Sequence, residues 1–311
     1  KMFDKPVVAI LHLVVYLGFV IINIELIEIV IDGLFGTHRV LSFLGGFYDF
    51  LIAFFEIFAF LVLVSVVIFL IRRNIIRIKR FVQSEMKGWP TLDGNLILIF
   101  EILLMVAFLT MNAADSILQI NYPDKYIQAG SFPVSNFFIV PFLENLSTGS
   151  LIIIERFSWW FHIIGILCFL NYLAISKHLH ILLAFPSTYY SKLDPKGQFS
   201  NMESVTKEVK VMLDPSVDPF SQTSDVSPET FGAKDVRDLN WLQLLNAYSC
   251  TECGRCTSEC PANITGKKLS PRKIMMDVRD RVEELGNAID KNGKDFNDGK
   301  SLLNDYIKPE E

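Results

Sequence analysis

Two observations predict an all-α protein, built as a bundle of four transmembrane helices followed by a small helical domain around a cysteine-rich loop. The first is the distribution of apolar residues: 51% of the 311 residues are hydrophobic, and nearly all of this apolarity lies before residue 187. An ordinary soluble domain is not this apolar. The second is a cluster of cysteines. Four of the five cysteines in the chain lie in one short stretch: Cys250, Cys253, Cys256 and Cys260.

The transmembrane prediction rests on four long apolar runs, residues 6–31, 47–71, 95–120 and 157–185. Each run reaches the roughly 20 residues that a helix needs to cross a hydrocarbon core of about 30 Å. Buried helices of a large soluble protein are the alternative, which runs of this length disfavour. The first run is also too long for a cleavable signal peptide and lacks a small-residue cleavage site. We therefore expect residues 1–187 to form a transmembrane domain.

The basic residues predict the orientation of this domain. The loop between the second and third runs carries Arg72, Arg73, Arg77, Lys79, Arg80 and Lys87. Because cytoplasmic loops have an excess of Lys and Arg, this loop is predicted to be cytoplasmic. With four crossings, both termini and the cysteine loop then lie on the cytoplasmic side as well. Neither this pattern nor the formal net charge of -5 suggests a nucleic-acid partner.

The composition changes after Pro186. Residues 188–234, which include LDPSVDPFSQTSDVSPET, predict a weakly structured linker. Residues 235–311 are expected to form the second domain. It begins with an amphipathic helix that leads into the cysteines, and its second helix is expected to start at Ser270 as N-cap and Pro271 as first residue. The apolar stripe of that second helix is predicted to be Ile274, Met275, Val278 and Val282.

The cysteine loop has the spacing C-x2-C-x2-C-x3-C-P, which is typical of the [4Fe-4S] sites of bacterial ferredoxins. A disulfide is disfavoured because cytosolic thiols are kept reduced, and structural zinc usually uses two separate C-x2-C pairs. In two-cluster ferredoxins the fourth cysteine of such a run binds the other cluster. Cys260 therefore either closes a single cluster or contributes to a second cluster whose other ligands lie outside this sequence. Cys168, in the fourth apolar run, is expected to be a small core residue.

The histidines suggest haem ligation. His162 and His180 are five helical turns apart, which would place them on one face of the fourth helix with about 27 Å between them. His12 should lie at the depth of His180, and His38 at the depth of His162. Two such pairs would suit two b-type haems in a cytochrome b-like bundle. His178 is an alternative ligand, and some of these histidines could instead be interfacial residues.

Six polar residues fall within the apolar runs: Glu25, Glu28, Glu56, Glu101, Asn112 and Asp115. Ionisable groups in a membrane mark proton paths or ligand sites, or they lie at helix ends in water. The sequence leaves both alternatives open. Glu25 and Glu28 share one face of the first helix and are the first candidates for mutation.

The segment FGAKDVRDLNWLQLLNAYSCTECGRCTSECPANITGKKLSPRKIMMDVRD resembles membrane-anchored iron-sulfur oxidoreductases related to heterodisulfide reductase. The segments LHLVVYLGF and WWFHIIGILCFLNYLAISKHLHILLAFP resemble the dihaem cytochrome b module of nitrate reductase gamma subunits. The resemblance implies two b haems, a menaquinone site, two cubane clusters and further cysteine-rich domains. It assigns cluster ligation to the four loop cysteines, and haem ligation to His12, His38, His162 and His180.

The resemblance also implies a location and a function. The family lies in the bacterial inner membrane, and some members pass electrons from electron-transfer flavoprotein, a soluble partner, to menaquinone. The family continues into a second cysteine run, so the chain is expected to be incomplete at its C-terminus. The leading hypothesis is a membrane-bound, quinone-linked iron-sulfur oxidoreductase. The alternatives are a non-catalytic anchor and electron-wire subunit, working with further iron-sulfur subunits, and a haem-free iron-sulfur redox sensor.

Overall fold

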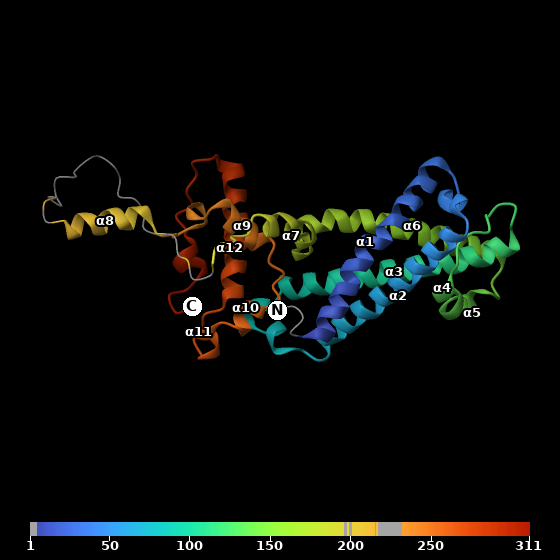
Figure 1. The fold of residues 1–311 in the computed structure, drawn as a ribbon, viewed down its shortest axis with the longest axis horizontal. Coiled ribbons are helices and arrows are strands. Elements are labelled where there is room, and N and C mark those ends of the chain that lie inside the picture. The colour runs from blue at the N-terminus through green and yellow to red at the C-terminus, as the bar shows by residue number, and fades with distance from the viewer. Residues whose placement is uncertain (1–4, 196–197, 199–200, 215, 217–231) are drawn as a thin grey trace. The chain divides into compact units, whose positions relative to one another are not determined.

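The computed structural model describes residues 5–195, 198, 201–214, 216 and 232–311. The chain divides into two compact units, Lys1–Ser176 and Lys177–Glu311. Both units are helical, and no β-strand occurs in the described residues (Figure 1). The predicted all-α class is therefore confirmed.

Four long helices form the first unit. All four are long and apolar enough to cross a membrane, which confirms the four predicted spans. Their bounds are α1 Pro6–Phe35, α2 Gly46–Asn74, α3 Trp89–Asn121 and α6 Thr148–Tyr172.

The core of this bundle lies where α3 packs against α2 and α6. Phe108 is fully buried at its centre, among aliphatic side chains from all four helices. The outward-facing side chains are mostly large and apolar, for example Phe50, Leu103 and Ile153. A lipid environment favours such a surface, because a helix satisfies its own backbone hydrogen bonds and presents only side chains to the lipid.

The fourth helix differs from its prediction. Instead of one helix over residues 157–185, α6 starts nine residues earlier, after the N-cap Ser147, and ends at Tyr172. A short 3-10 turn, η4 (Leu173–Ile175), follows, and Ser176 has an extended backbone. The hydroxyl groups of Tyr172 and Ser176 both donate to Asp93 of α3, which is 1% exposed. These bonds hold the chain at the point where the helix stops.

The chain resumes as η5 (Lys177–Leu179) and α7 (His180–Tyr189), which belong to the second unit. His162 and His180 are therefore not on one continuous helix, and the predicted five-turn register between them is wrong. A periodicity argument holds only while the helix continues, and this helix ends before His180.

The connection from α3 to α6 contains two short helices that the sequence did not predict, α4 (Pro133–Phe138) and α5 (Val140–Leu143). Glu56 of α2 determines where α4 begins. Its carboxylate accepts hydrogen bonds from the backbone N-H of Val134, at 3.0 Å, and of Ser135, at 3.2 Å. These N-H groups at the start of a helix have no partner within the helix itself.

The second unit is built around α12, which spans Pro271–Asn292. The Ser270 hydroxyl accepts a bond from the N-H of Lys273, which confirms the predicted N-cap. Val278 is buried, and Met275 and Val282 pack against the same cluster, so most of the predicted stripe is confirmed. Other elements are α8 Glu203–Leu213, η6 Val236–Asp238, α9 Trp241–Tyr248, α10 Arg255–Ser258, α11 Pro261–Ile264 and η7 Leu302–Tyr306.

The predicted linker contains α8, so residues 188–234 are not uniformly without secondary structure. Most of LDPSVDPFSQTSDVSPET, residues 217–230, lies outside the described residues. The helix before the cysteines begins at Trp241, five residues after Val236, because Asn240 caps it through the N-H of Gln243.

A buried arginine connects two segments of this unit that are far apart along the chain. Arg281 is 1% exposed and donates to the carboxylates of Asp235, at 2.8 Å, and Asp298, at 2.5 Å. Asp235 also accepts from the N-H of Leu302. A charge this deeply buried requires such partners, because an unpaired buried charge is strongly destabilising.

Replacing Arg281 with methionine should destabilise the second unit by on the order of 3–5 kcal/mol, because two carboxylates lose their partner. The measurement is a urea titration of the detergent-solubilised protein, in which limited proteolysis within residues 177–311 reports the unfolding of the second unit. Arg237→Met is the control, since Arg237 is exposed and its side chain donates to the carbonyl of Phe296 rather than to a carboxylate. Equal urea midpoints for the two variants would contradict the assignment.

The hydrogen bonds from Arg281 lower the pKa of Asp298 to about 2. A carboxyl group with a lowered pKa stabilises the fold above its unfolded pKa, and this contribution disappears as the pH falls through the folded value. Asp298→Asn should therefore lower the stability of the unit at pH 7 and have a much smaller effect at pH 2, where about half of the Asp298 carboxyl groups are protonated. Urea midpoints at the two pH values test this expectation. A difference of the same size at both would refute it.

Candidate functional site

The cysteine loop lies between α9 and α11 in the second unit. Cys250 follows the C-cap of α9, and Cys260 immediately precedes Pro261, the first residue of α11. Between them the backbone takes left-handed conformations at Glu252, with φ of 55°, and at Gly254, with φ of 70°. Two left-handed residues make the chain reverse over a short length, so the loop curls back on itself as a cluster-binding loop must.

All four loop cysteines are free thiols. Cys256 is exposed, and the other three are half-buried. Burial raises the pKa of the Cys250 thiol, and the nearby Cys253 and Cys256 contribute to the same shift. The thiols of Cys253 and Cys256 therefore lie close enough to Cys250 to influence its ionisation.

No three His, Cys, Asp or Glu side chains in the described part of the chain are arranged as ligands of a single metal ion. A cubane cluster binds each thiolate through a different iron atom, so its cysteines surround a volume rather than meet at one point. The spacing C-x2-C-x2-C-x3-C is typical of such a cluster, whereas structural zinc usually uses two separate C-x2-C pairs.

Glu252 fixes the shape of the loop. It lies between the first two cysteines, is 2% exposed, and forms ion pairs with Lys177 and with Arg279 of α12, the latter at 2.7 Å. These two cations balance the buried carboxylate, and they hold a residue in a backbone conformation that is unfavourable for a side chain with a Cβ. Sequence reasoning missed Glu252, because its partners are 75 and 27 residues away along the chain.

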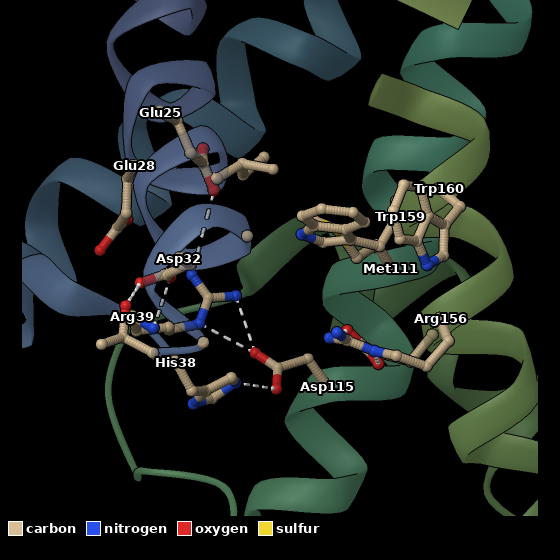
Figure 2. Close-up of a pocket in the computed structure, with 15 residues that line it drawn as sticks. Glu25, Glu28, Asp32, His38, Arg39, Met111, Asp115, Arg156, Trp159 and Trp160 are labelled. Atoms are coloured by element: carbon tan, nitrogen blue, oxygen red, sulfur yellow. Dashed lines mark hydrogen bonds and ion pairs between the residues drawn. The ribbon is translucent and has the colours of Figure 1, made fainter. Parts of the chain in front are cut away.

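A separate group of polar residues lies in the first unit, at the end of the bundle where α1 ends and α6 begins. We call this end of the bundle the Arg39 end. Arg39 follows α1 and is 7% exposed. Its Nε donates to Asp115 at 2.9 Å, its Nη2 to Asn112 at 3.1 Å, and its Nη1 to the Tyr48 hydroxyl at 3.2 Å. Figure 2 shows Arg39 between Asp115 and Glu25.

The sequence left the roles of the carboxylates in the apolar runs open, and their hydrogen-bond partners in the structure now distinguish them. Glu28 accepts from the N-H of Leu41, at 2.9 Å, and from the Tyr48 hydroxyl, at 2.8 Å, so it holds the turn after α1. Glu56 anchors α4, and Asp115 anchors Arg39. Glu25 differs from these three, because its Oε2 is buried without a hydrogen-bond partner among the described residues.

Both ring nitrogens of His38 are engaged at the Arg39 end. Its Nδ1 accepts from the N-H of Ile127 at 3.3 Å, and its Nε2 lies 2.9 Å from Asp115. Accepting at Nδ1 assigns the neutral tautomer with its proton on Nε2. His38 could ligate a haem iron only by giving up one of these bonds.

His162 is buried on α6, with its Nδ1 3.1 Å from the carbonyl of Leu104. Leu104 and Asp115, the partner of His38, are eleven residues apart on α3, about 16 Å along the helix axis. The structure therefore does not bring His38 and His162 to one position. Both remain separate predictions as haem ligands.

His12 lies on the exposed side of α1 in the first unit. His178 and His180 lie in the second unit, with ring centroids 5.4 Å apart, and His180 Nδ1 is 3.1 Å from the carbonyl of Lys177. The pairing of His12 with His180 thus spans both units and stays a prediction. Cys168 is exposed, so its expected place in the core is wrong.

Four apolar helices and a cubane-type cysteine loop define the class of membrane-anchored iron-sulfur proteins. Comparison with known proteins agrees. The chain is 32% identical over 280 residues to the probable iron-sulfur-binding oxidoreductase FadF of Bacillus subtilis. The matched region covers 90% of this chain and 35% of FadF. It is 25% identical to the EtfAB:quinone oxidoreductase of Syntrophomonas wolfei, covering 88% of this chain and 34% of that protein.

A shorter match of 54 residues is 37% identical to a probable membrane-anchored ferredoxin of Chromohalobacter salexigens, and covers 17% of this chain and 8% of that protein. The chain spans about a third of the length of the first two relatives. No family model and no solved structure matches it. These relatives confirm the resemblance to iron-sulfur oxidoreductases, whereas the likeness to nitrate reductase gamma subunits is not among their names and stays a prediction.

Glu252→Ala should loosen the cysteine loop, because Lys177 and Arg279 lose their shared carboxylate. Breaking a buried ion pair in this way costs on the order of 3–5 kcal/mol. Hydrogen exchange at residues 250–260 should speed up by more than tenfold. Glu259→Ala is the control, since Glu259 is exposed on the same loop. Equal exchange rates in the two variants would show that Glu252 does not fix the loop.

Proposed function

We propose that this protein carries electrons between a soluble redox partner and a membrane quinone pool, through a [4Fe-4S] cluster held by Cys250, Cys253, Cys256 and Cys260. The observation that carries the proposal is the combination in one chain of this cysteine loop with four helices that can cross a membrane. The name of the Syntrophomonas relative, an EtfAB:quinone oxidoreductase, supports electron-transfer flavoprotein as the partner and quinone as the membrane substrate.

A [4Fe-4S] cluster, when bound, supplies one-electron transfer. The chain's own residues prepare the site for it. The loop cysteines supply the thiolates, and the left-handed residues Glu252 and Gly254 make the loop turn. Lys177 and Arg279 hold Glu252 through ion pairs, and with it the backbone between the first two cysteines.

The proposal also includes b-type haems with ligands among His12, His38, His162, His178 and His180. The buried position of His162 supports it as a ligand, because an uncharged imidazole inside a membrane bundle is a common haem ligand. Menaquinone is the proposed quinone, and the bacterial inner membrane is the proposed location. The basic loop between α2 and α3 supports a cytoplasmic position for both termini and the cysteine loop.

The optical spectrum of the detergent-purified protein, air-oxidised and then dithionite-reduced, tests this function. We expect the broad absorbance of an iron-sulfur cluster, reduced b-haem bands and close to four iron atoms per chain in the cluster. Cys253→Ser should lose most of the cluster iron and keep the haem bands. His162→Ala should lose haem and keep the cluster.

The two variants separate the parts of the proposal. If Cys253→Ser retains the iron content and spectrum of the wild type, the loop is not the cluster site. If a pyridine haemochrome assay finds no haem in the wild type, the cytochrome part fails, and an iron-sulfur protein without haem remains.

A further inference from the structure

A pocket of about 240 Å³ opens at the Arg39 end of the bundle, between α1, α3 and α6. One wall is polar and comes from α1 and the turn after it, with Glu25 and Arg39. The other wall comes from α6, with Trp159 and Trp160. In Figure 2, Glu25 is turned toward Arg39, and Trp159 lies across the pocket from them.

Glu25 is the residue on the polar wall whose hydrogen bonds are incomplete. It is 3% exposed, and its Oε2 has no partner in the described part of the chain. Its Oε1 lies 3.9 Å from Nη1 of Arg39, which is too long for a direct hydrogen bond. A buried polar atom without a partner is destabilising, so a carboxyl group kept in this state points to a partner that binds there.

Arg39 has a matching open position. A guanidinium has five N-H donors. Three hydrogen bonds use its Nε, Nη2 and Nη1, to Asp115, Asn112 and Tyr48 respectively, and Nη2 also forms an ion pair with Asp115. Nη1 has a second hydrogen, and this nitrogen lies 3.9 Å from Oε1 of Glu25. An oxygen atom placed between Nη1 and the Glu25 carboxyl group would complete the hydrogen bonding of both residues.

The opposite wall suits a flat aromatic ring. Trp159 and Trp160 stand edge to face, with ring centroids 4.9 Å apart. Gly33 of α1 leaves room for this wall, because a Cβ there would lie 2.7 Å from Cη2 of Trp159. Trp160 is 57% exposed at the bundle surface, where an apolar tail could extend into lipid.

We propose that this pocket binds the head group of a quinone or quinol, with Glu25 and Arg39 holding one ring oxygen and Trp159 stacking on the ring. Glu25 and Arg39 can bind the ring oxygen in both redox states. A quinol hydroxyl donates to a carboxylate, and a quinone carbonyl accepts from an N-H group or a protonated carboxyl. The pocket is smaller than the roughly 300–1,000 Å³ of sites for drug-sized ligands, which fits one or two rings. This inference rests on the proposed quinone-linked function and assigns its site.

The test uses 2-methyl-1,4-naphthoquinone and its anaerobically reduced form, which are the head group without a tail. Binding to the detergent-solubilised full-length protein is measured by equilibrium dialysis, and quenching of tryptophan fluorescence reports the location. Glu25→Gln keeps the size of the side chain and replaces one carboxyl oxygen with an amide group that can only donate, so we expect the affinity for the reduced form to fall about tenfold. Trp159→Phe should keep binding and lose part of the quenching.

Glu101→Gln is the matched control. Glu101 is a half-buried carboxyl group of α3, fourteen residues before Asp115 and about 21 Å from it along the axis. It should bind both forms of the probe like the wild type. Equal haem content in wild type and Glu25→Gln is the check that the variant has not lost a cofactor instead.

Each other outcome is informative. If the wild type binds the probe and Glu25→Gln binds equally well, the pocket holds a bridging water, and the quinone site lies elsewhere, while the proposed function stands. If Glu25→Gln loses haem, the pocket belongs to a haem, and the inference is overturned. If the wild type does not bind either form of the probe, both the inference and the quinone-linked function fail.

Discussion

The buried guanidinium of Arg39 is the interaction on which the Arg39 end of the membrane unit depends. A charge inside a membrane bundle is tolerated only when protein groups replace the solvent around it. Asp115 supplies the opposite charge, and Asn112 and Tyr48 take further donors. Tyr48 in turn donates to Glu28, which holds the turn after α1, so α1, α2 and α3 are joined through one side chain. Among the described residues that line the pocket, Glu25 has a buried side-chain oxygen that this network leaves without a hydrogen-bond partner.

The second unit also pairs its buried charges. Arg281 joins Asp235 and Asp298, which are distant along the chain, to α12, and Glu252 joins the cysteine loop to α12 through Arg279. In both cases a long helix provides the fixed support, and a buried ion pair attaches an irregular segment to it. A loop attached in this way can present its thiols in a fixed arrangement through polar contacts, outside the apolar cluster of the unit.

Sequence alone predicted features that depend on local pattern, namely the four apolar spans and the N-cap at Ser270. It could not predict features that depend on distant partners. The helix at α6 stops because Asp93, about 80 residues earlier, bonds Tyr172 and Ser176. The carboxylates looked alike as sequence, and only their partners in space show that Glu56 anchors a helix whereas Glu25 lacks a partner.

The central claim is that the cysteine loop holds a redox-active cluster that exchanges electrons with a quinone. Electron paramagnetic resonance of the dithionite-reduced full-length protein, before and after an anaerobic addition of 2-methyl-1,4-naphthoquinone, tests it most directly. The account predicts a reduced-cluster signal that disappears within the mixing time of the quinone and is absent in Cys253→Ser. A signal that persists after the quinone is added, or that is unchanged in Cys253→Ser, would contradict it.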